Sequence, residues 1–162
     1  MSFPLHKTAI DIKPKVRGEI VAILNHLLAD ITDLYSQTKQ AHWNVRGPQF
    51  IMLHELFDKQ ASAVFEHIDP LAERMAALGG VVGGTVRAAA KHSRLKEFPT
   101  EGKNGLGYLE ALIERFGVTG NAFREAVDQT SELGDAATSD LLTGILRELD
   151  QSLWFLEAHH SV

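Results

Sequence analysis

The stretch VRGEIVAILNHLLADITDLYSQTKQAHWNV (residues 16–45) determines which kind of fold this chain can adopt. Its apolar residues recur at spacings of three and four, at Ile20, Leu24, Leu27, Leu28, Ile31 and Leu34. That spacing places them on one face of an amphipathic helix. Gly47 and Pro48 follow and favour a turn. The sequence therefore predicts one long helix, from about Val16 to Val45, that ends at a tight turn.

Further segments carry the same helical pattern. They span about Pro48–Leu78, Leu106–Leu133 and Ala136–Ala158. A long connection, residues 85–103, joins the second segment to the third. Connections of more than about 12–15 residues without structure of their own are uncommon, so we expect a short helix over Thr85–Ala90. This order predicts an all-α, ferritin-like four-helix bundle with a short helix in its long crossover.

Length and composition limit the remaining possibilities. The 162 residues are 44% apolar, which suits one domain over residues 1–162 with a short N-terminal arm at 1–15. The absence of cysteine excludes disulfides, zinc-thiolate sites and cysteine nucleophiles. A net charge of −5 makes the chain a poor ligand for polyanions. With no long apolar run and no signal-peptide pattern, we expect no membrane span and a cytoplasmic location.

Five residues stand out as ligands for iron or zinc: His42, His54, Asp58, Asp69 and Glu73. His54 with Asp58, and Asp69 with Glu73, have i,i+4 spacing, so each pair shares one helix face. Asp58 and Asp69 are eleven residues apart, or about 16 Å along a helix, which is too far for one metal site. The pairs therefore form two unrelated sites, or each site is completed by another subunit.

The position of the turn favours a site at the first pair. His42 lies about five residues before the turn and His54 about six after it, so two antiparallel helices bring both to a similar level. A second copy of the chain, related by a twofold axis near Ala63 and Val64, would place its own Asp69 and Glu73 level with them. Imidazole and carboxylate together suit iron, zinc or manganese, and carboxylates can bridge two ions.

The sequence around these residues resembles one family. The segment KQAHWNVRGPQF (39–50), the pattern His54-Glu-x-x-Asp58, the pattern Asp69-x-x-Ala-Glu-Arg74 and the closing LWFLE (153–157) are similar to the Dps family. These are the DNA-binding proteins from starved cells, or mini-ferritins. The resemblance covers nearly the whole chain from about Val16.

The resemblance implies a hollow homododecamer with ferroxidase sites at its twofold interfaces. Each site would take His42, His54 and Asp58 from one chain, and Asp69 and Glu73 from its mate. The implied cofactor is dinuclear iron, for which zinc can substitute, and the implied substrates are Fe(II) and hydrogen peroxide. Two Fe(II) ions supply the two electrons that reduce peroxide to water, so hydroxyl radical is avoided. The ferric product would be stored as mineral, protecting the cell from oxidative stress.

Other residues carry weaker hypotheses. Pro70 interrupts the second helix, and one interpretation is that Asp69 caps a restarted helix with Pro70 in its first turn. Asp135 and Asp140 either cap the last helix or line a threefold pore that attracts Fe(II). Trp43 is equally a packing residue or an electron donor to the site. For Trp154 we expect packing.

Three alternatives remain open. The chain could be a nucleoid protein that compacts DNA, but the arm carries few lysines and the C-terminus carries none, so we expect weak or absent DNA binding. The same ligands could serve a hydrolase with a metal-activated water. A 24-subunit ferritin is the structural rival, but the Glu-x-x-His motif inside its bundle is missing.

Overall fold

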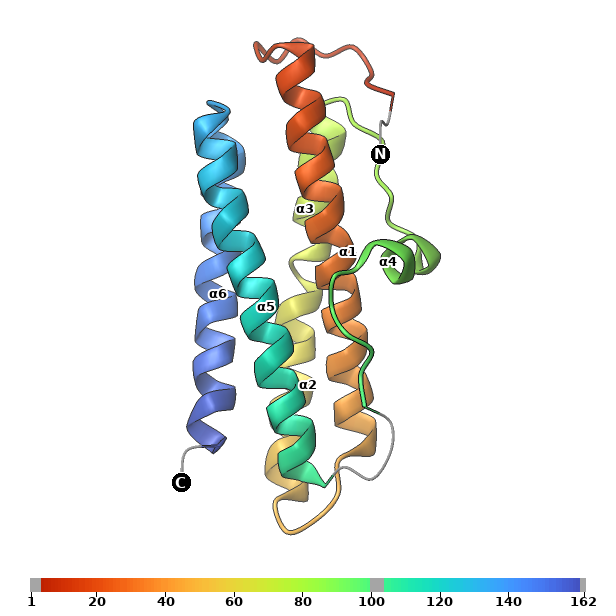
Figure 1. Ribbon diagram of the computed structural model, residues 1–162, viewed down its shortest axis with the longest axis vertical. Coiled ribbons are helices and arrows are strands. Elements are labelled where there is room, and N and C mark those ends of the chain that lie inside the picture. Colours follow the sequence, from red (N-terminus) through yellow and green to blue (C-terminus); the bar gives the residue numbers. More distant parts are fainter. Residues whose placement is uncertain (1–3, 100–103, 161–162) are drawn as a thin grey trace.

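The computed structural model describes residues 4–99 and 104–160, and every regular element within these ranges is helical. The helices are α1 (Pro14–Asn44), α2 (Phe50–Phe65), α3 (Ile68–Ala77), α4 (Val86–His92), α5 (Gly105–Glu132) and α6 (Ala136–His160). Figure 1 shows α1, the α2–α3 pair, α5 and α6 side by side along the long axis, with α4 outside them on the crossover. The predicted all-α bundle with a helical crossover is confirmed. None of the described helices is long and apolar enough to cross a membrane.

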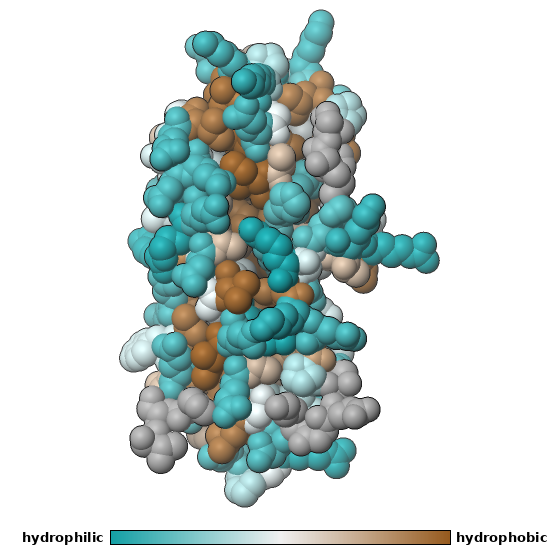
Figure 2. Space-filling view, in the orientation of Figure 1, coloured by the Kyte–Doolittle hydropathy of each residue, from teal (hydrophilic) through white to brown (hydrophobic). Residues whose placement is uncertain are grey.

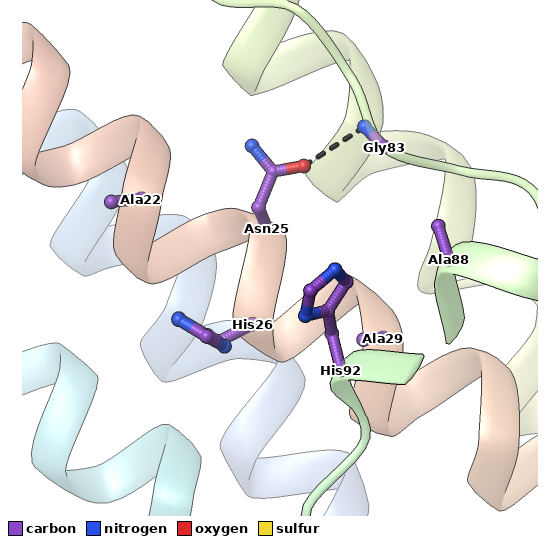
Figure 3. Close-up of a pocket in the computed structure, with 7 residues that line it drawn as sticks. All are labelled: Ala22, Asn25, His26, Ala29, Gly83, Ala88 and His92. Atoms are coloured by element: carbon purple, nitrogen blue, oxygen red, sulfur yellow. Dashed lines mark hydrogen bonds between the residues drawn. The ribbon is translucent and has the colours of Figure 1, made fainter. Parts of the chain in front are cut away.

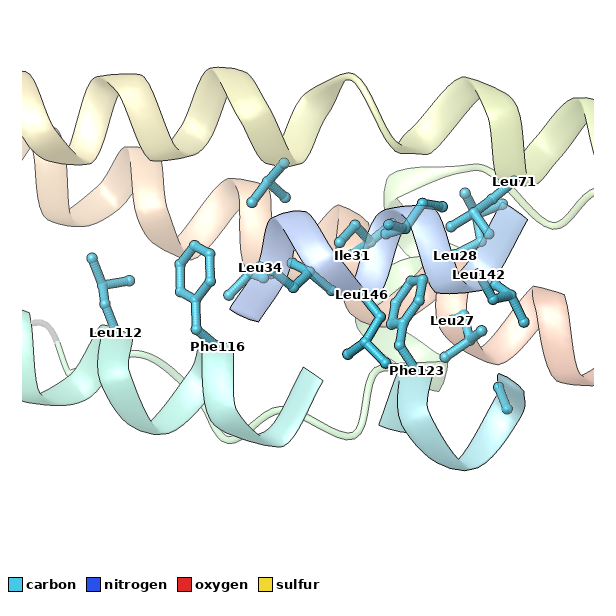
Figure 4. Packing of buried hydrophobic residues seen from close by; sticks show 14 of the residues in the cluster. Leu27, Leu28, Ile31, Leu34, Leu71, Leu112, Phe116, Phe123, Leu142 and Leu146 are labelled. Atoms are coloured by element: carbon cyan, nitrogen blue, oxygen red, sulfur yellow. The ribbon is translucent and has the colours of Figure 1, made fainter. Parts of the chain in front are cut away.

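The apolar stripes of the four long columns meet in one core. Ile20, Leu24, Ile31 and Leu34 of α1 are fully buried, as the spacing predicts. Large aromatic side chains from the neighbouring helices fill the space between the columns, among them Phe57, Phe116 and Phe123 (Figure 4). Each such burial stabilises the fold by about 1.5–3 kcal/mol. The face seen in Figure 2 is mainly hydrophilic, as expected for the opposite sides of these helices.

The second long segment is two helices, so the prediction of one continuous helix from Pro48 to Leu78 is wrong. Proline has no N–H to donate to the residue four before it, and its ring clashes with that carbonyl. For Pro70 that residue is Glu66, and α2 ends at Phe65. Pro70 then lies in the first turn of α3, as expected, but the N-cap position is held by His67 rather than Asp69. Figure 1 shows that α3 continues in the direction of α2.

The chain leaves α3 through Gly79, which has a φ of 81°. The Gly79 N–H donates to the Ala76 carbonyl and the Gly80 N–H to the Met75 carbonyl. These bonds satisfy carbonyls that the end of a helix leaves unpaired, and the positive φ is the reason that glycine is used. The predicted break at this point is confirmed.

The N-terminal arm lies against this helix end. The His6 N–H donates to the Gly79 carbonyl at 2.7 Å. Arg17, buried at 6% exposure, donates to the carbonyls of Leu78 at 2.7 Å and His6 at 3.3 Å. Leu5 and Ile12 pack against the core. The described part of the arm is therefore fixed to the bundle by hydrogen bonds and apolar contacts.

Candidate metal centre

His42 and His54 face each other across the turn between α1 and α2. Their rings are stacked, with centroids 3.8 Å apart and an angle of 22° between the planes. The His42 Nδ1 lies 2.8 Å from the carbonyl oxygen of His54, and the His54 Nδ1 lies 2.9 Å from that of His42. The turn therefore brings the two imidazoles to one level, as the spacing predicts.

These reciprocal hydrogen bonds determine which ring nitrogen can bind a metal. A carbonyl oxygen only accepts, so both Nδ1 atoms must carry the proton. In a neutral imidazole the Nε2 then holds the free lone pair. Metal-binding histidines are commonly oriented by a hydrogen bond from the other ring nitrogen. The two histidines thus orient each other's rings, and both Nε2 atoms are left to bind a metal.

Asp58 is the third residue of this cluster, one turn further along α2. Its Oδ1 is 3.8 Å from the His42 Nε2. Metal–nitrogen and metal–oxygen bonds are about 2.0–2.2 Å long. One metal ion can therefore bind both atoms across this distance. The side chain is half exposed at 51%, so the open side of the cluster faces away from the bundle.

Lys39 occupies the cation position beside Asp58. Its Nζ is 2.6 Å from the same Oδ1. This hydrogen bond and charge hold the pKa of Asp58 below its ordinary value, in spite of an opposing contribution from desolvation. The carboxylate is therefore ionised at neutral pH. A metal ion bound at Asp58 takes the place of the lysine ammonium.

Asp69 and Glu73 lie elsewhere, exposed on the surface of α3. Because α3 continues from α2, these carboxylates remain at a different level from Asp58. Within the described ranges 4–99 and 104–160, no three histidine or acidic side chains of one chain are grouped closely enough to hold a metal ion. The single chain thus carries two separated half-sites, and the requirement for a second chain stays a prediction.

Exposed apolar side chains surround the first half-site. Trp43, Ile51 and Phe65 are 67%, 61% and 53% exposed. A groove of about 460 Å³ runs between α1, the α2–α3 pair and α4, lined among others by Tyr35, Lys39, Trp43 and Phe65. Large exposed apolar patches are typical of protein–protein contacts. Trp43 lies 5.7 Å from the Lys39 Nζ, measured to the ring centroid, and so stands beside the cluster rather than in the core.

The two candidate pore residues differ in their surroundings. Asp135 is 3% exposed and forms a bidentate ion pair with Arg74, at 2.8 and 2.9 Å. It also accepts from the Thr138 N–H and hydroxyl, which is the role of a helix cap. These bonds lower its pKa against the opposing effect of burial. Its position favours the capping interpretation, whereas Asp140 is exposed on the first turns of α6.

Two features of the site were missed by reasoning from the sequence. The reciprocal bonds between His42 and His54 use backbone carbonyls, which no residue pattern reveals. The contact of Lys39 with the site could have been predicted, because Lys39 lies three residues before His42 and so on the same helix face. Trp154 also departs from expectation, because it is 60% exposed in the single chain instead of packed.

Comparison with known proteins shows which class of protein the chain resembles. A family model described as the ferritin-like domain matches residues 21–161, in agreement with the bundle and its crossover. The chain is 45% identical over 154 residues to the DNA protection during starvation protein of Agrobacterium fabrum, covering 95% of both chains. It is 32% identical over 140 residues to the DNA protection during starvation protein 2 of Bacillus anthracis, covering 86% of this chain and 95% of that one.

Solved structures of Dps proteins have the same fold as this chain. DpsA14 from Streptomyces coelicolor superposes with a TM-score of 0.91 at 35% identity, covering 98% of this chain and 94% of that one. The Dps protein of Vibrio cholerae O1, described as a ferritin-like diiron-carboxylate protein, gives 0.89 at 26% identity over 98% and 99%. The chain belongs to the Dps family of ferritin-like proteins.

Proposed function

We propose that this protein is a ferroxidase that oxidises Fe(II), preferentially with hydrogen peroxide, and stores the ferric product inside a dodecameric shell. The observation that carries the proposal is the pair of histidines in which each Nδ1 donates to the other's backbone carbonyl. Both Nε2 atoms are then left to bind metal, and that of His42 lies 3.8 Å from the Asp58 Oδ1. The diiron-carboxylate description of a structural relative supports iron as the metal.

The site would be completed at a twofold interface. His42, His54 and Asp58 of one chain would meet Asp69 and Glu73 of its mate, giving two nitrogens and three carboxylates for a pair of iron ions. This ligand set suits Fe(II), and Zn²⁺ would compete for it. The exposed apolar side chains around the first half-site support such an interface, because a contact between two chains would bury them.

Two iron ions at one site balance the reaction with peroxide. Each Fe(II) loses one electron, and the two electrons with two protons convert hydrogen peroxide to two water molecules. A single iron ion would supply one electron and release hydroxyl radical. The exposed Trp43 indole beside Lys39 is a candidate donor for oxidising equivalents that escape this pairing.

Anaerobic loading with Fe(II) followed by a pulse of peroxide tests the reaction. We expect fast formation of ferric absorbance at two Fe(II) per peroxide in the wild type, and its loss in the double variant His54→Ala, Asp58→Ala. Lys59→Ala, on an exposed position next to Asp58, is the matched control. Equal and slow oxidation in all three proteins would contradict the proposal and return the hydrolase alternative to first place.

Mixed assemblies test whether the site lies between subunits. The variant His54→Ala, Asp58→Ala lacks one half-site, and Asp69→Asn, Glu73→Gln lacks the other. In an isologous pair of one chain of each kind, one of the two sites has all of its ligands, so random mixing restores roughly a quarter of wild-type activity. Activity that stays at the level of the separate variants would mean that the two pairs serve unrelated sites.

Iron uptake through a pore is a separate proposal that now rests on Asp140. Asp140→Asn should slow uptake into the shell without changing oxidation at saturating Fe(II). Glu19→Gln, an exposed acid on α1, serves as the control for the loss of one charge. Unchanged uptake in Asp140→Asn would remove the pore from the proposal.

DNA compaction is the weaker functional alternative. Binding by such shells uses free basic tails that neutralise phosphates, but the described arm is held by Arg17 and by the bond between His6 and Gly79. We therefore propose weak or absent DNA binding at neutral pH. Releasing the arm with Arg17→Ala should strengthen a gel shift at low salt. Tight complexes with the wild-type protein would contradict this.

A further inference from the structure

We infer that His26 and His92 form a second metal site, independent of the ferroxidase cluster, that binds one divalent transition-metal ion such as Zn²⁺. His26 projects from α1 and His92 from the last turn of α4, so residues 66 positions apart in the chain meet on the outside of the bundle. Their ring centroids are 6.5 Å apart and the planes are nearly perpendicular, at 83°. Figure 3 shows the two rings beside the same small cavity.

The nitrogens of these rings are available. Within the described part of the chain, neither ring forms a hydrogen bond to a side chain or to the backbone, and their recorded ring contact is with each other. A histidine that serves only the fold usually bonds to a neighbour, as His159 does with the Phe155 carbonyl. Two imidazoles that meet with free lone pairs are a ligand pair for a metal ion.

The distance between the rings suits a shared ion. A metal–nitrogen bond of about 2.0–2.1 Å puts each ring centroid roughly 3.2 Å from the ion. Two rings on one ion then have centroids roughly 6.4 Å apart if the bonds are in line and roughly 5.2 Å apart at a tetrahedral angle, so a tetrahedral site needs the rings to approach by roughly 1.3 Å. A small rotation of the exposed His26 side chain supplies that change, since no hydrogen bond holds its ring.

The cavity provides space for the other ligands. It has a volume of about 170 Å³, and small residues such as Ala22, Ala29 and Ala88 form much of its wall. Water molecules can therefore complete the coordination. Asn25 accepts from the Gly83 N–H at 2.9 Å and donates to the Val21 carbonyl at 3.0 Å. This bridge ties the crossover to α1 and so holds α4, and with it His92, near His26.

The surrounding charges permit a cation. The rings of both histidines lie beside the cavity, and the lone pairs that a metal ion needs are not engaged in hydrogen bonds among the described residues. On the other side of His26, Glu125 of α5 lines a cavity of about 100 Å³ that His26 also lines. The Arg94 guanidinium in that cavity is paired with the buried Asp30. Imidazole ligands favour Zn²⁺, Cu²⁺ or Ni²⁺ over Mg²⁺ and Ca²⁺.

Calorimetric titration with Zn²⁺ tests the site, using the assembled His54→Ala, Asp58→Ala protein so that the first cluster is disabled. We expect one ion per chain with a dissociation constant in the micromolar range. Adding His26→Ala or His92→Ala should weaken this binding about tenfold or more. His6→Ala, which removes an exposed histidine on the arm, should leave it unchanged. Anomalous scattering from crystals soaked in Zn²⁺ should place the ion between the two rings.

Zn²⁺ binding that is equal in the background protein, His26→Ala and His92→Ala would overturn the inference, as would anomalous density at any other place alone. Helix content measured by circular dichroism, together with the milder pair His26→Gln and His92→Gln, separates loss of the site from loss of the fold. The site does not depend on the proposed ferroxidase activity. Its failure leaves peroxide-driven oxidation unchanged, and failure of that oxidation leaves this titration unchanged.

Discussion

The two histidine pairs that begin on α1 are built differently. His42 and His54 are stacked at 3.8 Å, and each Nδ1 is bonded to the other's backbone carbonyl. His26 and His92 meet edge to face at 6.5 Å with no hydrogen bond to either ring among the described residues. The first pair is therefore oriented before any metal arrives, and the second is oriented by the metal itself.

The two pairs therefore differ in when the cost of orienting the rings is met. Fixing a side chain in one rotamer costs conformational entropy, and in the first pair the backbone bonds have already met that cost during folding. An oriented pair suits a reaction in which iron must bind in one geometry at every turnover. An unoriented pair suits occasional or regulatory binding at lower affinity.

The two pairs should differ most in how their loss changes the rate of Fe(II) oxidation. His42→Ala removes a proposed ligand and the ring that stacks on His54, so the initial rate of Fe(II) oxidation should fall by about 10- to 100-fold. The matched change His26→Ala should leave the rate unchanged. Stopped-flow absorbance after peroxide addition measures both. A similar fall in both variants would mean that the two pairs act together.

The next effect concerns the lysine that distinguishes the first cluster. Lys39→Gln removes the cation that competes with a metal ion for Asp58, so Zn²⁺ should bind this cluster several-fold more tightly. Because Asp58 is half exposed, screening by solvent should keep this gain small. Lys59→Gln on the neighbouring residue is the control, with calorimetry as the measurement. Weaker binding in Lys39→Gln would show that the lysine assists the metal.

Stability should also distinguish the pairs. His42→Ala removes the hydrogen bond from the His42 ring to the His54 carbonyl and should cost about 0.5–1.5 kcal/mol. His26→Ala removes an exposed ring without hydrogen bonds and should change stability by less than about 0.5 kcal/mol. Urea denaturation at one fixed protein concentration, without metal, gives both values. Equal losses would refute the claim that only the first pair is preorganised.

The smallest expected change is in the pKa of Asp58. Lys39 lowers the folded-state pKa of Asp58 below the ordinary value of 3.8. The ionised form of Asp58 is thus favoured in the folded state. Its contribution to stability is present above pH 3.8 and is lost as the pH falls through the lower pKa that Asp58 has in the folded protein. In Lys39→Gln the Asp58 pKa should rise, as NMR titration of the carboxyl carbon would show. An unchanged pKa would mean that the 2.6 Å contact does not persist in solution.

Much of the fold could be predicted from residue spacing. Apolar residues at three and four predicted α1, α5 and α6 to within about two residues, because one buried stripe is enough to define an amphipathic helix. Gly79 and Gly134, both with positive φ, lie just beyond the ends of α3 and α5, where the predicted segments also end. The break between α2 and α3 was less visible, because its position depends on the carbonyl that Pro70 excludes rather than on the hydrophobic pattern.

Residue spacing correctly predicted that His42 lies beside His54 and close to Asp58, because a tight turn sets the level of two antiparallel helices. That these residues bind metal stays a prediction. Residue spacing could not show that Asp135 is buried against Arg74, residues 61 positions apart, because that contact depends on how α3 packs against α6. It also assigned no role to His26 and His92, which lie on different elements.

By itself, the sequence determined the helices, the turn and the residue types that can bind metal, because these follow from local spacing and side-chain chemistry. Which ring nitrogens are free, which cation pairs with Asp58 and where the arm lies became visible only in the folded chain. The hydrogen bonds behind these three features join residues 12 to 61 positions apart. Contacts of that kind exist only once the helices have taken their places in the bundle.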